Sequence, residues 1–310
     1  RRPGRQLVRG YKATRVAAGH APGSPEWLRL MTASKVSAVL GVSPWESPFG
    51  LWHRMNGTLE AEPGNDETAR GNYHEAGVLA WFKDQHPELR VRANSVLWQS
   101  KRNPRYAATP DGIALEGKQR AGIEIKTSAY ESWDEGIPVH YRVQCVWQAH
   151  VIGLDRIYVA ALTKNLRHVE HVLEYDAEEG DWIEAQVQGF LDSLDTGQAP
   201  PIDGHAATTK AIKKLHPQID PTEVEISPSD FFDIAAAKEE ADLAEERLAA
   251  VKNELAAFMG NAERAVCDGQ RVAARRSRNG GTPYLQLASG LPEATQIATQ
   301  IANNPEVKTA

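Results

Sequence analysis

Apolar residues recur at helical spacing in several parts of the chain. Within 71–86, Glu75, Val78, Leu79 and Phe82 stand at i, i+3, i+4 and i+7, the pattern of an amphipathic helix. This helix would carry one carboxylate, that of Glu75, on its apolar face. The same reasoning predicts further helices at 32–40, 139–153 and 181–194.

Short apolar runs bounded by polar residues predict six strands, at 89–99, 106–109, 112–115, 122–127, 156–163 and 168–175. In the fourth, Ile123 and Ile125 alternate with Glu124 and Lys126. Successive side chains of a strand point to opposite faces, so the isoleucines would enter a core and the charged pair would share the other face. The simplest interpretation of that face is a solvated ion pair worth about 0.5 kcal/mol.

The periodic pattern of apolar residues stops after residue 198. Residues 198–228 are rich in proline and have no period, as expected of a linker. An apolar stripe from Ala241 to Phe258 then predicts a long charged helix, and 262–278 predict a basic hairpin that turns at Asp268-Gly269. We therefore expect a flexible basic arm (1–25), an α/β domain (26–203), a linker (204–228), a helix with a short basic hairpin (229–285) and a disordered tail (286–310).

The composition excludes several classes of protein. A chain with 41% hydrophobic and 25% charged residues is globular, and no apolar run is long enough for a membrane span. No signal peptide is evident, and we expect a cytosolic protein. The two cysteines lie far apart, so neither a zinc ribbon nor a cysteine-ligated iron–sulfur cluster is possible. The net charge is −6, so nucleic-acid binding would need local basic segments such as 1–20 and 264–278.

Four charged residues could converge on one place. Glu75 comes from a predicted helix, Asp111 follows Pro110 at a strand edge, and Glu124 and Lys126 lie on the next strand. Three carboxylates beside a lysine are costly to hold together unless a cation compensates their charge. Hard oxygen ligands favour Mg²⁺ or Mn²⁺, so this pattern is typical of metal-assisted phosphodiester hydrolysis.

This order of motifs resembles the PD-(D/E)XK nucleases, and more closely the phage lambda exonuclease and YqaJ viral recombinase family. The resemblance covers about 26–203, and its motifs are Glu26-Trp27, Arg29, Thr32-Ala33-Ser34, Gly71, Glu75, Thr109-Pro110-Asp111-Gly112, Gly122-Ile123-Glu124-Ile125-Lys126 and Gln144. It implies a restriction-endonuclease-like core, in which a mixed central β-sheet is flanked by helices.

The resemblance also implies a role for each matched residue. Asp111, Glu124 and the Ile125 carbonyl would hold Mg²⁺, with Glu75 at a second ion, and Lys126 would position the nucleophile. Gln144 would complete the catalytic set. The residues expected to contact DNA are Arg29, Ser34, Lys35 and Tyr141.

Plainer interpretations stay open for three of these residues. Glu75 could be a charge near a helix N-terminus that the helix dipole favours, Gln144 could cap the ends of strands, and Arg29 could be an ordinary surface residue. Three tryptophans are interpreted as core residues rather than as base-stacking groups, namely Trp45, Trp52 and Trp81.

The resemblance implies Mg²⁺-dependent 5′-to-3′ degradation of linear double-stranded DNA in the cytoplasm of a bacterial host, with Mn²⁺ as a substitute. The product would be a 3′ single strand for phage or prophage recombination. The expected partners are DNA ends, a single-strand annealing protein and further copies of the chain in a trimeric ring. The alternatives are a restriction-like or junction-resolving endonuclease with the same metal chemistry and a catalytically silent DNA-binding scaffold.

Overall fold

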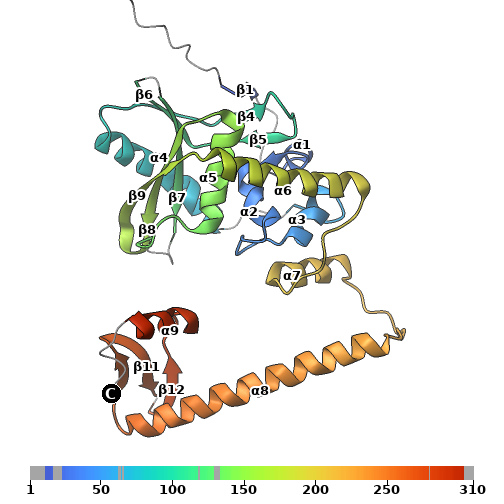
Figure 1. Ribbon diagram of the computed structural model, residues 1–310, viewed down its shortest axis with the longest axis vertical. Helices are drawn as coiled ribbons and strands as arrows, with labels where there is room; N and C mark the ends of the chain where they lie inside the picture. The colour runs from blue at the N-terminus through green and yellow to red at the C-terminus, as the bar shows by residue number, and fades with distance from the viewer. Residues whose placement is uncertain are drawn as a thin grey trace, which may run out of the picture. The chain divides into compact units, whose positions relative to one another are not determined.

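The computed structural model describes residues 11–16, 23–61, 64, 66–117, 119–128, 133–278 and 280–303. The chain divides into two compact units, Arg1–Ile219 and Asp220–Ala310 (Figure 1). Of the predicted basic arm, 1–10 and 17–22 lie outside the described residues. Among the helices that the structure describes, none combines the length and the apolar character needed to cross a membrane.

The first unit contains two sheets and most of the helices. Its elements in chain order are β1 (Ala13–Val16), α1 (Pro25–Leu28), β2 (Met31–Thr32), α2 (Ala33–Val39), α3 (Pro48–Met55), α4 (Asp66–Gln85), β3 (Arg90–Ala93), β4 (Leu97–Ser100), β5 (Tyr106–Ala108), β6 (Gly112–Glu116), β7 (Gln119–Thr127), α5 (Val139–Ile152), β8 (Arg156–Thr163), a 3₁₀ turn (Lys164–Leu166), β9 (Arg167–Glu174), α6 (Ala177–Thr196) and α7 (Ala206–Leu215).

The larger sheet has the order β3-β6-β7-β8-β9. Only β7 and β8 run parallel in it, because α5 carries the chain from one to the other as a crossover. Helix α4 covers one face of this sheet and α5 covers the other (Figure 1). The prediction of a mixed central sheet flanked by helices is therefore confirmed.

Each face of the large sheet has its own apolar core. On one face Ile123 and Ile125 of β7 pack with Val78, Leu79 and Phe82 of α4, as the alternation in the sequence predicted. The opposite face packs against α5. Successive side chains of β8 also alternate between the two cores. Separate cores on the two faces fix the register of β7, since a slip of one residue would exchange its apolar and charged sides.

The smaller sheet has the order β1-β4-β5-β2. Strand β1 pairs with β4, so the expectation of a flexible arm is wrong for Ala13–Val16, where backbone pairing orders the chain. The single strand predicted at 89–99 is in fact two strands, β3 and β4, which belong to different sheets. Asn94 lies at the break. Its backbone N–H donates to the Asp111 carbonyl next to the last β3–β6 pair, and its side chain donates to the carbonyls of Val96 and Pro110.

The predicted linker contains a helix. Helix α7 buries Thr208 and Ala211, and Ala211 packs with Phe49 of α3 and with Leu59. The first unit accordingly extends to Ile219 rather than to 203. The cause is an apolar face at i, i+3, i+4 and i+7, formed by Thr208, Ala211, Ile212 and Leu215.

The second unit consists of α8 (Pro228–Met259), β10 (Arg264–Cys267), β11 (Gln270–Arg276), β12 (Tyr284–Leu287) and α9 (Ala294–Asn303). The hairpin turns at Asp268-Gly269, where both residues have positive φ, as predicted. Strand β12 adds a third strand to it, because Tyr284–Leu287 pair with 273–276. The expectation of disorder from residue 286 is therefore wrong as far as Asn303.

Two glycines of α6 give a test of the packing between α5 and α6. A Cβ at Gly180 would lie 2.5 Å from Tyr175 Oη and 2.7 Å from His150 Nδ1, two atoms that are hydrogen-bonded to each other at 2.8 Å. A Cβ at Gly189 would meet nothing within 4 Å.

We predict that Gly180→Ala lowers the free energy of unfolding by about 1–3 kcal/mol through overpacking. Gly189→Ala should instead raise it by roughly 0.5–1 kcal/mol, because alanine favours the helix. Urea denaturation of both variants checks this, and equal shifts of the same sign would contradict the packing described here.

Candidate active site

Strand β7 lies in the middle of the large sheet and presents Glu124 and Lys126 toward α5. Glu124 is only 2% exposed, although it carries a charge. The interpretation of this face as a solvated ion pair is therefore wrong. A buried carboxylate needs compensating partners, because its removal from water is costly.

Three side chains supply hydrogen bonds to Glu124. Lys126 Nζ and Gln144 Nε2 both donate to Glu124 Oε1 at 2.5 Å, and Gln148 Nε2 donates to Oε2 at 2.6 Å. A carboxylate has about four acceptor sites, so roughly one remains available. The two glutamines come from successive turns of α5, which fixes the carboxylate in one orientation.

Gln148 was not assigned to the site from the sequence. It is fully buried and reaches the catalytic strand from the middle of α5. The available signal was its spacing of four residues from Gln144, which places both amides on one helix face.

Asp111 reaches the same place from the connection between β5 and β6. Its Oδ2 accepts a hydrogen bond from the backbone N–H of Ile125 at 2.6 Å. Asn94 holds the connection: its backbone N–H donates to the Asp111 carbonyl at 2.8 Å, and its Nδ2 donates to the Pro110 carbonyl at 2.8 Å. Sequence reasoning missed Asn94, because its role depends on a contact with a segment 16 residues away.

The charges around Glu124 influence one another. Burial and the Glu124 carboxylate raise the pKa of Asp111 well above its usual range, against the opposing effect of Lys126. Burial and Glu124 also raise the pKa of the half-buried Glu75 on α4. Burial alone would lower the pKa of Lys126, but the carboxylates of Glu124 and Asp111 outweigh it and raise the pKa overall. Glu75, Asp111, Glu124 and Lys126 thus form one electrostatic cluster, as the sequence predicted.

This donor set fits a hard divalent cation. Its atoms are carboxylate oxygens, and their mutual repulsion is what a cation would relieve. The N–H and C=O of one strand residue point to the same side of the strand. Because the Ile125 N–H points to Asp111, the Ile125 carbonyl lies on that side as well, where a ligand role was expected.

Comparison with known proteins finds a family that resembles part of this chain. Residues 23–155, which include the Glu124 cluster, match the model of the YqaJ-like viral recombinase domain. A relative, the uncharacterized protein YqaJ of Bacillus subtilis (strain 168), is 31% identical over 206 residues, which are 62% of this chain. The match spans 63% of that relative's length.

Several solved exonuclease structures are similar to part of the chain. The alkaline exonuclease LHK-Exo of Laribacter hongkongensis is 19% identical with a TM-score of 0.46, over 56% of this chain and 94% of that one. A phage-related exonuclease of Haemophilus somnus 129PT is 14% identical with a TM-score of 0.42, over 55% and 96%. A putative exonuclease of Eubacterium rectale is 12% identical with a TM-score of 0.45, over 70% and 98%.

The residues expected to contact DNA occupy different environments in the YqaJ-like domain. Tyr141 is half-buried at the start of α5, and its ring centroid lies 4.9 Å from Lys126 Nζ, so it borders the Glu124 cluster. Arg29 is exposed at the C-terminal end of α1, and Ser34 is exposed on α2. Among the described residues, neither Arg29 nor Ser34 forms a hydrogen bond or ion pair with the cluster.

The expectation that Lys35 contacts DNA is wrong. Lys35 is 4% exposed, and its Nζ donates to the carbonyls of Trp27, Leu28 and Leu30 at 2.8, 3.2 and 2.6 Å. The ammonium also lies 3.9 Å from the centre of the Trp27 ring. Lys35 therefore fastens the end of α1, which is the segment that presents Arg29.

A second cluster of metal-ligating side chains lies at the far end of α5. His150 Nε2 and Glu184 Oε2 are 2.7 Å apart, whereas Asp181 lies 4.0 Å from the other ring nitrogen, Nδ1. Nδ1 is already hydrogen-bonded to the Tyr175 hydroxyl. The two carboxylates therefore flank opposite nitrogens of the ring and orient His150, and one ligand atom from each of the three residues lies within 4.8 Å of the others.

The fastening role of Lys35 can be tested on stability. Lys35→Met keeps the side-chain length but leaves three carbonyls without their donor, so we predict a loss of about 1–3 kcal/mol in the free energy of unfolding. Lys83→Met, on the exposed side of α4, is the control and should change stability by less than about 0.5 kcal/mol.

The loss should also grow with pH. Burial lowers the pKa of Lys35 from 10.5 to about 7. Between these values the unfolded chain binds more protons than the folded one, so the stability of the wild type rises with pH and that of Lys35→Met lacks this rise. Urea denaturation at pH 7 and pH 9 measures it, and a smaller difference at pH 9 would contradict the burial.

Proposed function

We propose that this protein is a metal-dependent DNA exonuclease that hydrolyses linear double-stranded DNA from the 5′ end and leaves 3′ single strands. The observation that carries the proposal is the buried Glu124 beside Asp111 within a YqaJ-like viral recombinase domain. A fold would not hold acidic groups with raised pKa values against one another without a function for them, since their repulsion costs stability.

Asp111, Glu124 and the Ile125 carbonyl would hold Mg²⁺, with Glu75 placed for a second ion, and Mn²⁺ would substitute. When bound, the metal supplies a Lewis acid for the phosphate and lowers the pKa of water. The chain's own groups do the positioning. Lys126 offers a compact ammonium that can orient a water molecule, and Gln144 and Gln148 keep Glu124 from rotating away.

The strand polarity and the biological setting belong to the same proposal. A viral recombinase domain is consistent with DNA ends as substrate and with phage recombination, in which a single-strand annealing protein would take up the product. We further propose a cyclic homo-oligomer, a trimeric ring, which would retain DNA although the chain carries a net charge of −6. Light scattering at micromolar concentration tests the ring, and a monomer both with and without DNA would refute it.

The central experiment follows linear duplexes labelled at either end, with covalently closed circular DNA alongside. Wild-type protein with Mg²⁺ should release the 5′ label first and leave the circle intact. Asp111→Asn and Glu124→Gln should slow digestion by roughly 100-fold or more, because each removes charge from the place where the reaction is stabilised. Duplex binding in Ca²⁺ should survive in both variants.

The control is Glu116→Gln, at the opposite end of β6, where the carboxylate is exposed and pairs with Arg156 at 3.1 Å. Its digestion rate should equal that of the wild type. If the wild type cleaves the circle, the protein is an endonuclease and the proposed exonuclease activity is refuted. If the wild type binds DNA but digests none, the protein is a DNA-binding scaffold.

The exposed Arg29 suits a terminal 5′ phosphate, because a guanidinium can form two charge-assisted hydrogen bonds with it. We predict that wild type digests 5′-phosphorylated duplex faster than 5′-hydroxyl duplex, and that Arg29→Ala abolishes the difference. Arg102→Ala, which removes an exposed arginine paired with Glu184, should keep it. Equal rates on both substrates for the wild type would remove the proposed role of Arg29.

A further inference from the structure

Trp45 is exposed, although the sequence indicated a core residue. Its accessible fraction is 62%, whereas that of Trp52, seven residues later, is 5%. A large apolar ring left in water forgoes the stabilisation that burial would give. Single exposed apolar residues are ordinary, so the loop that carries this one decides its meaning.

The loop between α2 and α3 holds Trp45 in place. Ser43 is buried, and its Oγ accepts hydrogen bonds from the backbone N–H groups of Trp45 and Glu46, each at 3.2 Å. Ser47 is buried as well, and its Oγ caps α3 by accepting from the Gly50 N–H at 3.0 Å. The backbone on both sides of Trp45 is thus fixed.

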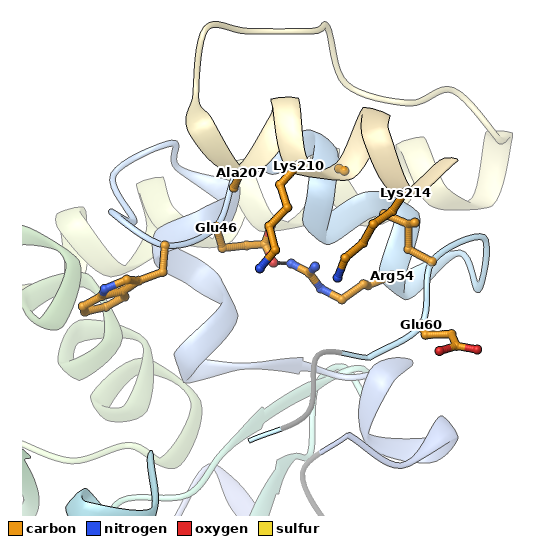
Figure 2. Close-up of a pocket in the computed structure, with 9 residues that line it drawn as sticks. Glu46, Arg54, Glu60, Ala207, Lys210 and Lys214 are labelled. Carbon is orange, nitrogen blue, oxygen red and sulfur yellow. Dashed lines mark ion pairs between the residues drawn. The ribbon is translucent and has the colours of Figure 1, made fainter. Parts of the chain in front are cut away.

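Two further contacts fasten the loop to α3 and α7. Glu46 forms an ion pair with Arg54 of α3, and His205, the N-cap of α7, donates from Nε2 to the Ser43 carbonyl at 3.0 Å. Trp45 lines a cavity next to this loop. Figure 2 shows Lys210 and Lys214 of α7 extending into the cavity beside Glu46 and Arg54. Helix α7, which lies in the predicted linker, therefore helps to fix the loop that presents Trp45.

Trp45 borders the catalytic cluster. Its ring centroid lies 4.8 Å from that of His140 and 6.0 Å from that of Tyr141, both at the start of α5. The Tyr141 ring in turn lies 4.9 Å from Lys126 Nζ. Only one aromatic ring thus separates Trp45 from the lysine of the site.

We propose that Trp45 stacks on a nucleobase of the DNA strand next to the phosphate that is cleaved, and so positions that strand. Stacking on an aromatic side chain accepts any base, which suits an enzyme that degrades DNA without regard to sequence. The ligand is an unpaired nucleotide at the end of the duplex, because a base inside the duplex has both faces covered by its stacked neighbours. This inference rests on the proposed function and adds to it a residue that positions the substrate.

The first test compares variants that keep or remove the flat ring. Trp45→Ala should weaken binding of DNA ends in Ca²⁺ by roughly 10-fold or more, Trp45→Phe should retain most of the affinity, and Trp45→Leu should not. The control is Trp182→Ala on α6, because Trp182 is 56% exposed and lies next to Asp181, at the end of α5 away from Tyr141. The affinity of Trp182→Ala for DNA ends should equal that of the wild type. The melting temperature of every variant should lie within a few degrees of the wild-type value.

The second test removes the base instead of the ring. An abasic site is moved one nucleotide at a time along the 5′ strand. At one position it should weaken binding by the wild type as much as Trp45→Ala does, and Trp45→Ala should show no further loss there.

The two proposals fail in different ways. If the wild type binds and digests DNA while Trp45→Ala binds normally, or if the two losses add at every position, stacking by Trp45 is refuted and the exonuclease stands. If the wild type neither binds nor digests DNA, the exonuclease and the stacking role are refuted together.

Discussion

The burial of one charge, the Glu124 carboxylate, determines how the larger sheet and its helices are assembled. At 2% exposure, water cannot compensate Glu124, so the protein supplies an ammonium and two amides. The ammonium comes from β7 itself, but the amides come from α5. Helix α5 must therefore lie over this face of β7 at a definite rotation, and the parallel β7–α5–β8 crossover delivers it there.

The other groups of the site depend on this arrangement. Because Glu124 and Lys126 face α5, the alternation of side chains along β7 places Ile123 and Ile125 against α4. Glu75 lies on this helix, close enough for Glu124 to raise its pKa. Asp111 can approach because β6 begins only at Gly112, which leaves the Ile125 N–H free to bind its carboxylate. The same strand thus organises two cores and one site.

The periphery of the site is stabilised by polar groups that have no part in the chemistry. Asn94 holds the Asp111 connection, Lys35 fastens the end of α1, and Ser43 and Ser47 fix the loop of Trp45. Each forms hydrogen bonds with backbone groups of a segment outside a regular helix or sheet. Without these bonds, the buried N–H and C=O groups of that segment would be unpaired, which would lower stability. Rigid connections of this kind allow loops to present side chains as reliably as strands do.

Local period and residue type in the sequence were enough to predict the alternation in β7, the apolar face of α4 and the turn at Asp268-Gly269. The convergence of Glu75, Asp111, Glu124 and Lys126 was expected from the order of the motifs along the chain, not from a short-range pattern. Four other features could not be predicted from the sequence: the break between β3 and β4, the pairing of Tyr284–Leu287 with β11, the burial of Lys35 and the exposure of Trp45. Each of these depends on a partner distant in sequence or on which face a neighbouring element covers. A lysine or a tryptophan has the same local propensities in water as in a core, so only the packed structure decides between these environments.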